Sequence, residues 1–162
     1  MRAALTFLLG LGLGAVVTTV AAQDRRLPGV VGINHIAIVT ANYEAMRAFY
    51  VDTMGFPEVF TSRNADGEPT LTYLQASRAT FIELFPANAT RQPGFQHVGL
   101  HVEDVNATAA RLRERGMTVG TPRQGGTGSI IVTVTDPDGT RIELSELGPE
   151  SRARQATDAW RP

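Results

Sequence analysis

The 162-residue chain has no cysteine and no lysine, so all 15 of its basic residues are arginine. The absence of cysteine excludes disulfides, thiol nucleophiles and thiolate metal ligands. The absence of lysine excludes Schiff-base amines and the lysine of phosphate-binding P-loops. Chemistry in this chain must therefore come from histidine, carboxylate, hydroxyl, phenol and guanidinium groups.

An excess of charge of either sign is also missing. The formal net charge is −1, with 43% hydrophobic and 19% charged residues, which is typical of one globular domain with a sizeable core. A neutral balance of this kind gives no indication of a nucleic acid partner or of binding to an anionic membrane surface.

The first residues differ from the rest of the chain. Arg2 precedes an apolar run from Leu5 to Val20, and two alanines follow before Gln23. This pattern predicts a secretory signal peptide over residues 1–22, hence a periplasmic or secreted protein with no membrane contact after cleavage. An uncleaved anchor is the alternative, although the run is shorter than the roughly 20 residues that span a bilayer.

The remaining sequence contains the same unit twice. NHIAIVT begins the first copy and QHVGLHV the second, so that His35 and His97 occupy equivalent positions. Asn42 and Asp104 follow at the same offset and are suitable N-caps for a helix in each copy. Three strands are expected after each helix, at 58–63, 70–76 and 80–85, and then at 117–121, 129–135 and 140–146. The pattern predicts an α+β fold with two βαβββ modules in tandem.

The predicted modules cover residues 31–85 and 94–147, which together form one domain over 31–147. Each helix is expected to end at a glycine, Gly55 or Gly116. The tail, residues 148–162, is charged and compatible with a frayed helix, and the sequence assigns it no role. We expect curved mixed sheets that leave a cleft between the modules.

Two glutamates stand where apolar residues are expected. Glu83 lies between two phenylalanines on one face of the strand 80–85, and Glu143 has the matching position in RIELS. A buried carboxylate costs several kcal/mol unless a positive charge compensates it. With His35 and His97, the two glutamates form a set of nitrogen and oxygen ligands that suits Ni, Co, Zn, Mn or Fe(II).

A structural role for these residues is the simpler alternative. A single histidine at the start of a strand is more often structural, and a single glutamate within a strand more often faces solvent. The repetition of both in a duplicated unit favours metal binding instead. His101, on the same strand face as His97, is either a hydrogen-bonding partner of the site or a satisfied core histidine.

Taken together, NHIAIVT, FYVDTMGF, FIELF, QHVGLHVED and TDPDGTRIELSE resemble the vicinal oxygen chelate superfamily. That superfamily includes glyoxalase I, extradiol dioxygenases, methylmalonyl-CoA epimerase and bleomycin-resistance proteins. The resemblance implies the glyoxalase fold and one divalent metal bound by four residues, His35, Glu83, His97 and Glu143. It also implies that Glu143, or secondarily Glu83, is the catalytic base.

Two positions depart from bacterial glyoxalase I. Val39 replaces an arginine that binds glutathione in that enzyme, and Ala87 replaces an asparagine. We therefore expect a glyoxalase-like lyase or isomerase that acts on a small oxygenated compound without glutathione and uses Ni, Co or Zn. The alternatives are an Fe or Mn extradiol-type dioxygenase, with His101 as acid or base, and a metal-free drug-binding protein.

The resemblance also implies a homodimer. Related proteins pair their two modules either within one chain or between the chains of a dimer. The sequence leaves open which of these two arrangements assembles the predicted metal site.

Overall fold

The computed structural model describes residues 27–161, so the predicted signal peptide, residues 1–22, lies outside the described part. The first module consists of β1 (Val30–Thr40), α2 (Tyr43–Ala48), the π-helical turn η1 (Phe49–Thr53), β2 (Glu58–Arg63), β3 (Pro69–Ser77) and β4 (Thr80–Pro86). The second consists of β5 (Gly94–Val102), α3 (Val105–Glu114), β6 (Arg123–Gln124), β7 (Ile130–Thr135) and β8 (Arg141–Glu146), and α4 (Arg152–Ala159) follows it. Within residues 27–161, no helix is long and apolar enough to cross a membrane.

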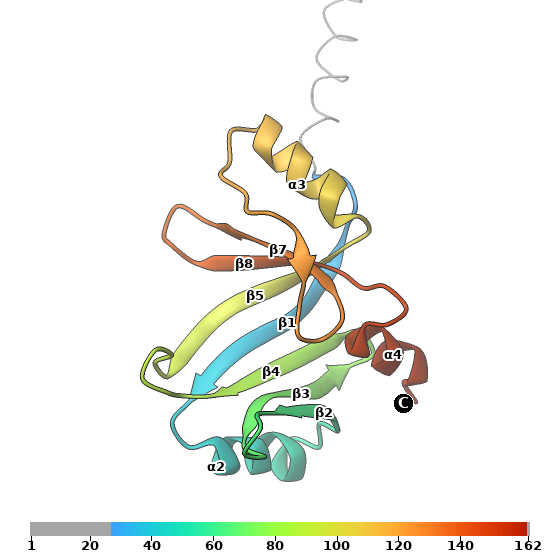
Figure 1. Cartoon of the computed structure of the whole chain (residues 1–162). Helices are drawn as coiled ribbons and strands as arrows, with labels where there is room; N and C mark the ends of the chain where they lie inside the picture. Colours follow the sequence, from blue (N-terminus) through green and yellow to red (C-terminus); the bar gives the residue numbers. More distant parts are fainter. Residues whose placement is uncertain (1–26, 162) are drawn as a thin grey trace, which may run out of the picture.

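The strands form one eight-stranded mixed sheet in the order β2-β3-β4-β1-β5-β8-β7-β6. The first strands of the two modules, β1 and β5, pair antiparallel at its centre. Each also pairs parallel with the last strand of its own module, β4 or β8. The order outward from the centre is therefore the same in both halves, and the sheet curls into a half-barrel (Figure 1). This confirms the predicted α+β fold of two tandem βαβββ modules, and it joins them within one chain.

The predicted caps start both helices. The side chain of Asn42 accepts a hydrogen bond from the backbone N–H of Ala45, and that of Asp104 accepts one from Ala107. The second helix ends before Gly116, whose φ of 83° satisfies the left-handed conformation that a helix stop needs. The first helix widens into η1 and ends before Gly55, which has a φ of 72°.

One predicted strand is wrong. Residues 117–122 form an irregular connection, and the edge strand β6 is confined to Arg123–Gln124, which pairs with Ile130 and Ile131 of β7. The guanidinium of Arg113 donates hydrogen bonds to the carbonyls of Val119 and Gly120, so this backbone is satisfied by α3 instead of by a neighbouring strand. Proline at 122 also removes a donor that a ladder would use.

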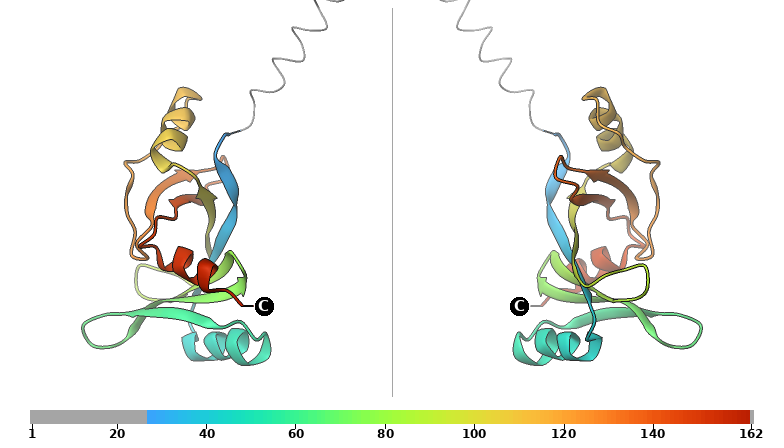
Figure 2. Two further views of the ribbon diagram at one scale, coloured as in Figure 1. Left: turned by 90° about the vertical axis from the view of Figure 1, so that its right-hand side faces the viewer. Right: turned by 90° about the vertical axis from the view of Figure 1, so that its left-hand side faces the viewer.

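The tail contributes a helix that the sequence left without a role. In α4, Ala153 and Ala156 are buried, at 1% and 9% exposure, against a cluster that includes Tyr73 of β3 and Phe81 of β4. The second core cluster lies under α3 and holds Val102, Leu112 and Leu144. Helix α4 follows the second module but packs on the strands of the first, and Figure 2 shows it in the opening of the curled sheet.

A charged side chain on the buried face of α4 should therefore destabilise the folded protein. We expect Ala153→Asp to lower the free energy of unfolding by about 3 kcal/mol, because it buries an unpaired carboxylate. Ala159→Asp, at an exposed position of the same helix, is the control and should change stability by less than about 0.5 kcal/mol. Urea unfolding monitored by circular dichroism measures both, and equal effects of the two variants would contradict the packing of α4.

Candidate metal centre

The strand register brings the four predicted ligands to the middle of the sheet. In one row across the strands, Ala37 of β1 lies between Glu83 of β4 and His97 of β5. In the next row, Gly99 of β5 lies between His35 of β1 and Glu143 of β8. Each row thus holds one imidazole, one carboxylate and one small residue. The small residues leave the space in which the long side chains of the adjacent strands meet.

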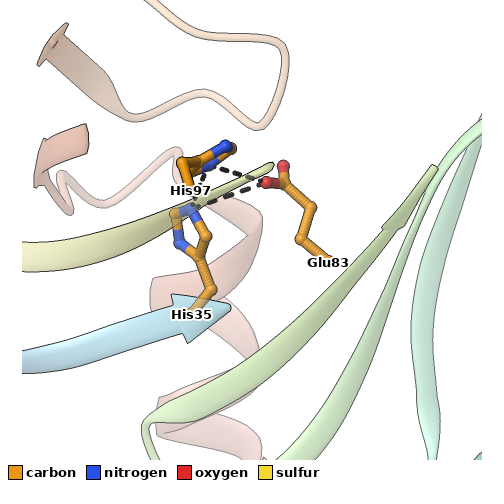
Figure 3. Close-up of side chains that lie close together, drawn as sticks. All are labelled: His35, Glu83 and His97. Atoms are coloured by element: carbon orange, nitrogen blue, oxygen red, sulfur yellow. Dashed lines mark hydrogen bonds and ion pairs between the residues drawn. The ribbon is translucent and has the colours of Figure 1, made fainter. Parts of the chain in front are cut away.

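Three of the four side chains converge on one point (Figure 3). The Nε2 atoms of His35 and His97 are 2.9 Å apart. The Oε2 atom of Glu83 lies 3.5 Å from the first of these nitrogens and 3.2 Å from the second. Glu143 is slightly farther away, with its Oε1 atom 3.7 Å from Nε2 of His35. All four residues therefore meet within one chain.

This arrangement fits a divalent metal. The ligand atoms of His35, Glu83 and His97 all lie within 4.8 Å of one another. Ligand distances of about 2.0–2.2 Å place neighbouring ligand atoms about 3 Å apart, close to the separations of the three atoms here. In addition, Oε2 of Glu83 is buried without a hydrogen-bond partner among the described residues. A cation would compensate this carboxylate, and the assignment of the four residues as ligands stays a prediction.

Each imidazole is oriented by the carboxamide that precedes it in the chain. Nδ1 of His35 is 3.0 Å from Oδ1 of Asn34, and Nδ1 of His97 is 3.2 Å from Oε1 of Gln96. The N–H on Nδ1 can donate to these oxygens, which leaves the Nε2 lone pair free for a metal. Sequence reasoning missed this pair, although an amide side chain precedes the histidine in both copies of the repeat.

The phenol of Tyr73 completes the surroundings of the first histidine. Its hydroxyl lies 3.2 Å from Nδ1 of His35, and its ring stacks on Phe60 at a centroid distance of 4.9 Å. Burial raises the pKa of Tyr73 well above its usual value, and Glu83 adds to this effect. Tyr73 therefore stays protonated and positions His35. The single sequence does not distinguish this tyrosine from other core aromatics.

The guanidinium of Arg141 competes with Gln96 for Nδ1 of His97. Nη2 of Arg141 lies 2.6 Å from Nδ1 of His97, and an arginine can only donate. In that contact Nδ1 accepts, and the imidazole proton sits on Nε2. Metal binding through Nε2 requires the other tautomer, with Nδ1–H donating to Gln96 and Arg141 turned away. Arg141 was not predicted, although its position two residues before Glu143 puts it on the same strand face.

Burial sets the protonation of the site. It lowers the pKa of His35 and of His97 to about 4, so both imidazoles are neutral at pH 7 and cannot balance the carboxylates. Burial also raises the pKa of Glu83, and it raises that of Glu143, where the neighbouring Glu83 charge adds to the effect. Neutral imidazoles are the form that binds a metal.

His101 takes no part in this cluster. It is half-buried on β5, and within the described residues no hydrogen bond connects it to any of the four predicted ligands. Burial lowers its pKa, and the Arg154 guanidinium of α4 lowers it further. The structure therefore favours neither a fully buried core histidine nor a direct partner of the site.

Comparison with known proteins gives a consistent family assignment. The model of the Glyoxalase/Bleomycin resistance protein/Dioxygenase superfamily matches residues 32–144. YaeR of Escherichia coli (strain K12) is 30% identical over 129 residues, which cover 73% of this chain and 98% of YaeR. A "Probable lactoylglutathione lyase" of Synechocystis is 32% identical over 120 residues, covering 68% of this chain and 91% of the relative.

A solved structure supports the same fold. Methylmalonyl-CoA epimerase from Mycobacterium tuberculosis matches with a TM-score of 0.66 and 27% identity. The match covers 80% of this chain and 97% of the epimerase chain.

Gly99 offers a direct test of the cluster geometry. A Cβ atom at this position would lie well inside van der Waals contact with the His35 ring, so Gly99→Ala must displace that imidazole. We expect at least a tenfold loss of affinity for Zn²⁺ or Ni²⁺, measured by isothermal titration. Gly32→Ala on β1, where an added Cβ meets nothing within 4 Å, should bind as wild type. Equal affinities of the two variants would contradict the placement of His35.

The buried carboxylate of Glu83 should cost stability when no cation is present. We expect Glu83→Gln at pH 8 to raise the free energy of unfolding of the chelator-treated protein by about 1 kcal/mol, because it removes a charge that burial disfavours. The same variant should gain much less thermal stability than wild type when Ni²⁺ or Zn²⁺ is added. Glu68→Gln, on the exposed β2–β3 turn, serves as the control. A chelator-treated Glu83→Gln protein less stable than wild type would contradict this account.

Proposed function

Because the chain belongs to the Glyoxalase/Bleomycin resistance protein/Dioxygenase superfamily, we propose that it is a metal-dependent lyase or isomerase acting on a small oxygenated compound. The observation that carries the proposal is the meeting of His35, Glu83 and His97 ligand atoms within 4.8 Å. These residues would hold one divalent ion, and Glu143 would complete the set. We propose Ni, Co or Zn as the metal.

The reaction we propose is the transfer of a proton between adjacent atoms of the substrate. A bound divalent ion supplies Lewis acidity toward a substrate carbonyl. The Glu143 carboxylate, released from the ion, would take a proton from the carbon next to that carbonyl and return it to the adjacent carbon. No oxidant or reductant is needed, because the proton is both removed and returned by the same carboxylate.

Glu143 suits the role of base better than Glu83. Its side chain is more exposed, at 14% against 8%, and it lies outside the group of three closest ligand atoms. In the metal-free chain its pKa is raised by burial and by the charge of Glu83. Ser145 donates a hydrogen bond to Oε1 of Glu143 at 3.2 Å and can hold the carboxylate in place.

We propose that glutathione is not a cosubstrate. Val39, where glyoxalase I carries an arginine, is 3% exposed and packs in the sheet. Ala87, where that enzyme carries an asparagine, offers no polar side chain. The turnover of the natural substrate should therefore not depend on added glutathione.

We also propose that the mature protein works outside the cytoplasm and forms a homodimer. Support for export comes from residues 1–22 alone, and cell fractionation tests it.

A partner surface for the homodimer is suggested by large apolar side chains exposed on the central strands β1 and β5, namely Val31, Ile33, Ile36 and Phe95. Light scattering of the purified chain measures the number of subunits.

Metal content and carbon-acid exchange test the proposed function together. Protein purified without chelators should contain about one divalent ion per chain and should catalyse deuterium incorporation from D₂O into an α-hydroxyketone or 2-oxo acid substrate. Glu143→Gln should slow this exchange by about 100-fold or more through loss of the base. Glu103→Gln, a carboxylate outside the cluster on the β5–α3 connection, is the control.

The alternative functions give different results. Oxygen uptake with catechols in the presence of Fe(II) would identify an extradiol-type dioxygenase. A metal-free protein whose ligand binding is unchanged by Glu83→Gln and Glu143→Gln would be a small-molecule binder. Either result overturns the proposed lyase or isomerase.

A further inference from the structure

The cleft over the cluster is rich in arginine. It has a volume of about 320 Å³, and its walls include Arg91, Arg123 and Arg141 together with the carboxylates Glu83 and Glu143. Three of the chain's 15 basic residues thus surround one small opening. The charge of these arginines is permanent, because a guanidinium does not lose its proton in proteins.

The carboxylates of the cleft would not balance the charge of its arginines once a metal is bound. A divalent cation held by His35, Glu83, His97 and Glu143 would balance the two carboxylates, so the three guanidinium groups would remain without a counter-charge. The Nε atom of Arg141 is buried and has no hydrogen-bond partner among the described residues. A buried donor without a partner is unfavourable, and an acceptor on a bound ligand would satisfy it.

Arg91 and Arg123 are positioned at the walls without acidic partners. Arg91 lies over the ring of Phe85, 4.4 Å from its centroid. Burial raises the pKa of Glu83, and the charge of Arg91 opposes only a part of that rise. Arg123 is exposed, and its side chain donates only a long hydrogen bond of 3.5 Å to the carbonyl of Gln124. Within residues 27–161, no ion pair joins either guanidinium to a carboxylate.

We propose that the substrate carries a carboxylate group in addition to the reacting carbonyl, and that Arg91 and Arg123 bind this carboxylate. The proposal rests on the proposed function, because the carbonyl end of the substrate is assigned to the metal cluster. A guanidinium presents two parallel N–H donors that match the two oxygens of a carboxylate. The cleft volume of about 320 Å³ limits the substrate to a small organic acid.

Two hydroxamates separate this proposal from the proposed function. Acetohydroxamate and succinate monohydroxamate both chelate a metal through the same two oxygens, and only the second carries a carboxylate. With the Zn²⁺-loaded protein, we expect succinate monohydroxamate to bind about tenfold more tightly, as measured by isothermal titration at constant ionic strength. One charge-assisted contact of about 1.4 kcal/mol corresponds to that factor.

Arginine variants identify the groups responsible. The double variant Arg91→Gln/Arg123→Gln should lose most of the tenfold preference, because only Arg141 remains in the cleft, while acetohydroxamate binding stays as in wild type. Arg111→Gln, on the outer surface of α3 beside Glu114, removes a guanidinium outside the cleft and should keep the tenfold preference.

Each further outcome has one meaning. Equal binding of both hydroxamates to the wild-type protein would overturn the carboxylate proposal and leave the metal centre intact. A full tenfold preference in the double variant would overturn the roles of Arg91 and Arg123. If the protein retains no metal and neither hydroxamate binds, the proposed function fails, and the carboxylate proposal fails with it.

Discussion

Two carboxylates held beside two uncharged imidazoles are the constraint on which this structure depends. Burial keeps the pKa of His35 and of His97 near 4, so neither ring can neutralise Glu83 or Glu143 at physiological pH. The sheet nevertheless places Oε2 of Glu83 within 3.5 Å of both rings and without a hydrogen bond. An arrangement this unfavourable for the chain alone is typical of a site built for a cation, where local stability is given up for function.

Duplication provides the geometry of the site, and residues that differ between the two modules give its two imidazoles different neighbours. Each module contributes a histidine next to a carboxamide, a glutamate on its last strand, and a small residue two positions after the histidine. Tyr73 then supports the imidazole of the first module only, whereas Arg141 contacts the imidazole of the second. Helix α4 covers strands of the first module. The two faces of a nearly symmetric cluster therefore meet different surroundings.

The parts of the structure that follow from local sequence could be predicted, and those that depend on distant contacts could not. Strand alternation, the caps Asn42 and Asp104, and the turn glycines are local signals, and the structure confirms them. The repeat doubles the signal of each of the four residues predicted as ligands, and the structure places these residues together; their role as ligands stays a prediction. The predicted strand at 117–121 is wrong, because the Arg113 side chain of α3 donates a hydrogen bond to a backbone carbonyl of this segment. The sequence assigned no role to the tail that forms α4, because the residues against which this helix packs lie far away in the sequence.

The contact between Arg141 and His97 connects the metal centre to the charge of the cleft. In the structure, Nδ1 of His97 accepts a hydrogen bond from this guanidinium, so the imidazole proton is on Nε2. This tautomer cannot bind a metal through Nε2. When Nε2 of His97 serves as a ligand, its Nδ1–H must instead donate to Gln96, which lies 3.2 Å away. Arg141 then loses its acceptor and retains its charge, so its donors become available to the cleft. Metal binding would therefore add a third guanidinium to the two at the walls, and an anionic group on the substrate would be held more strongly by the metal-loaded protein than by the metal-free one.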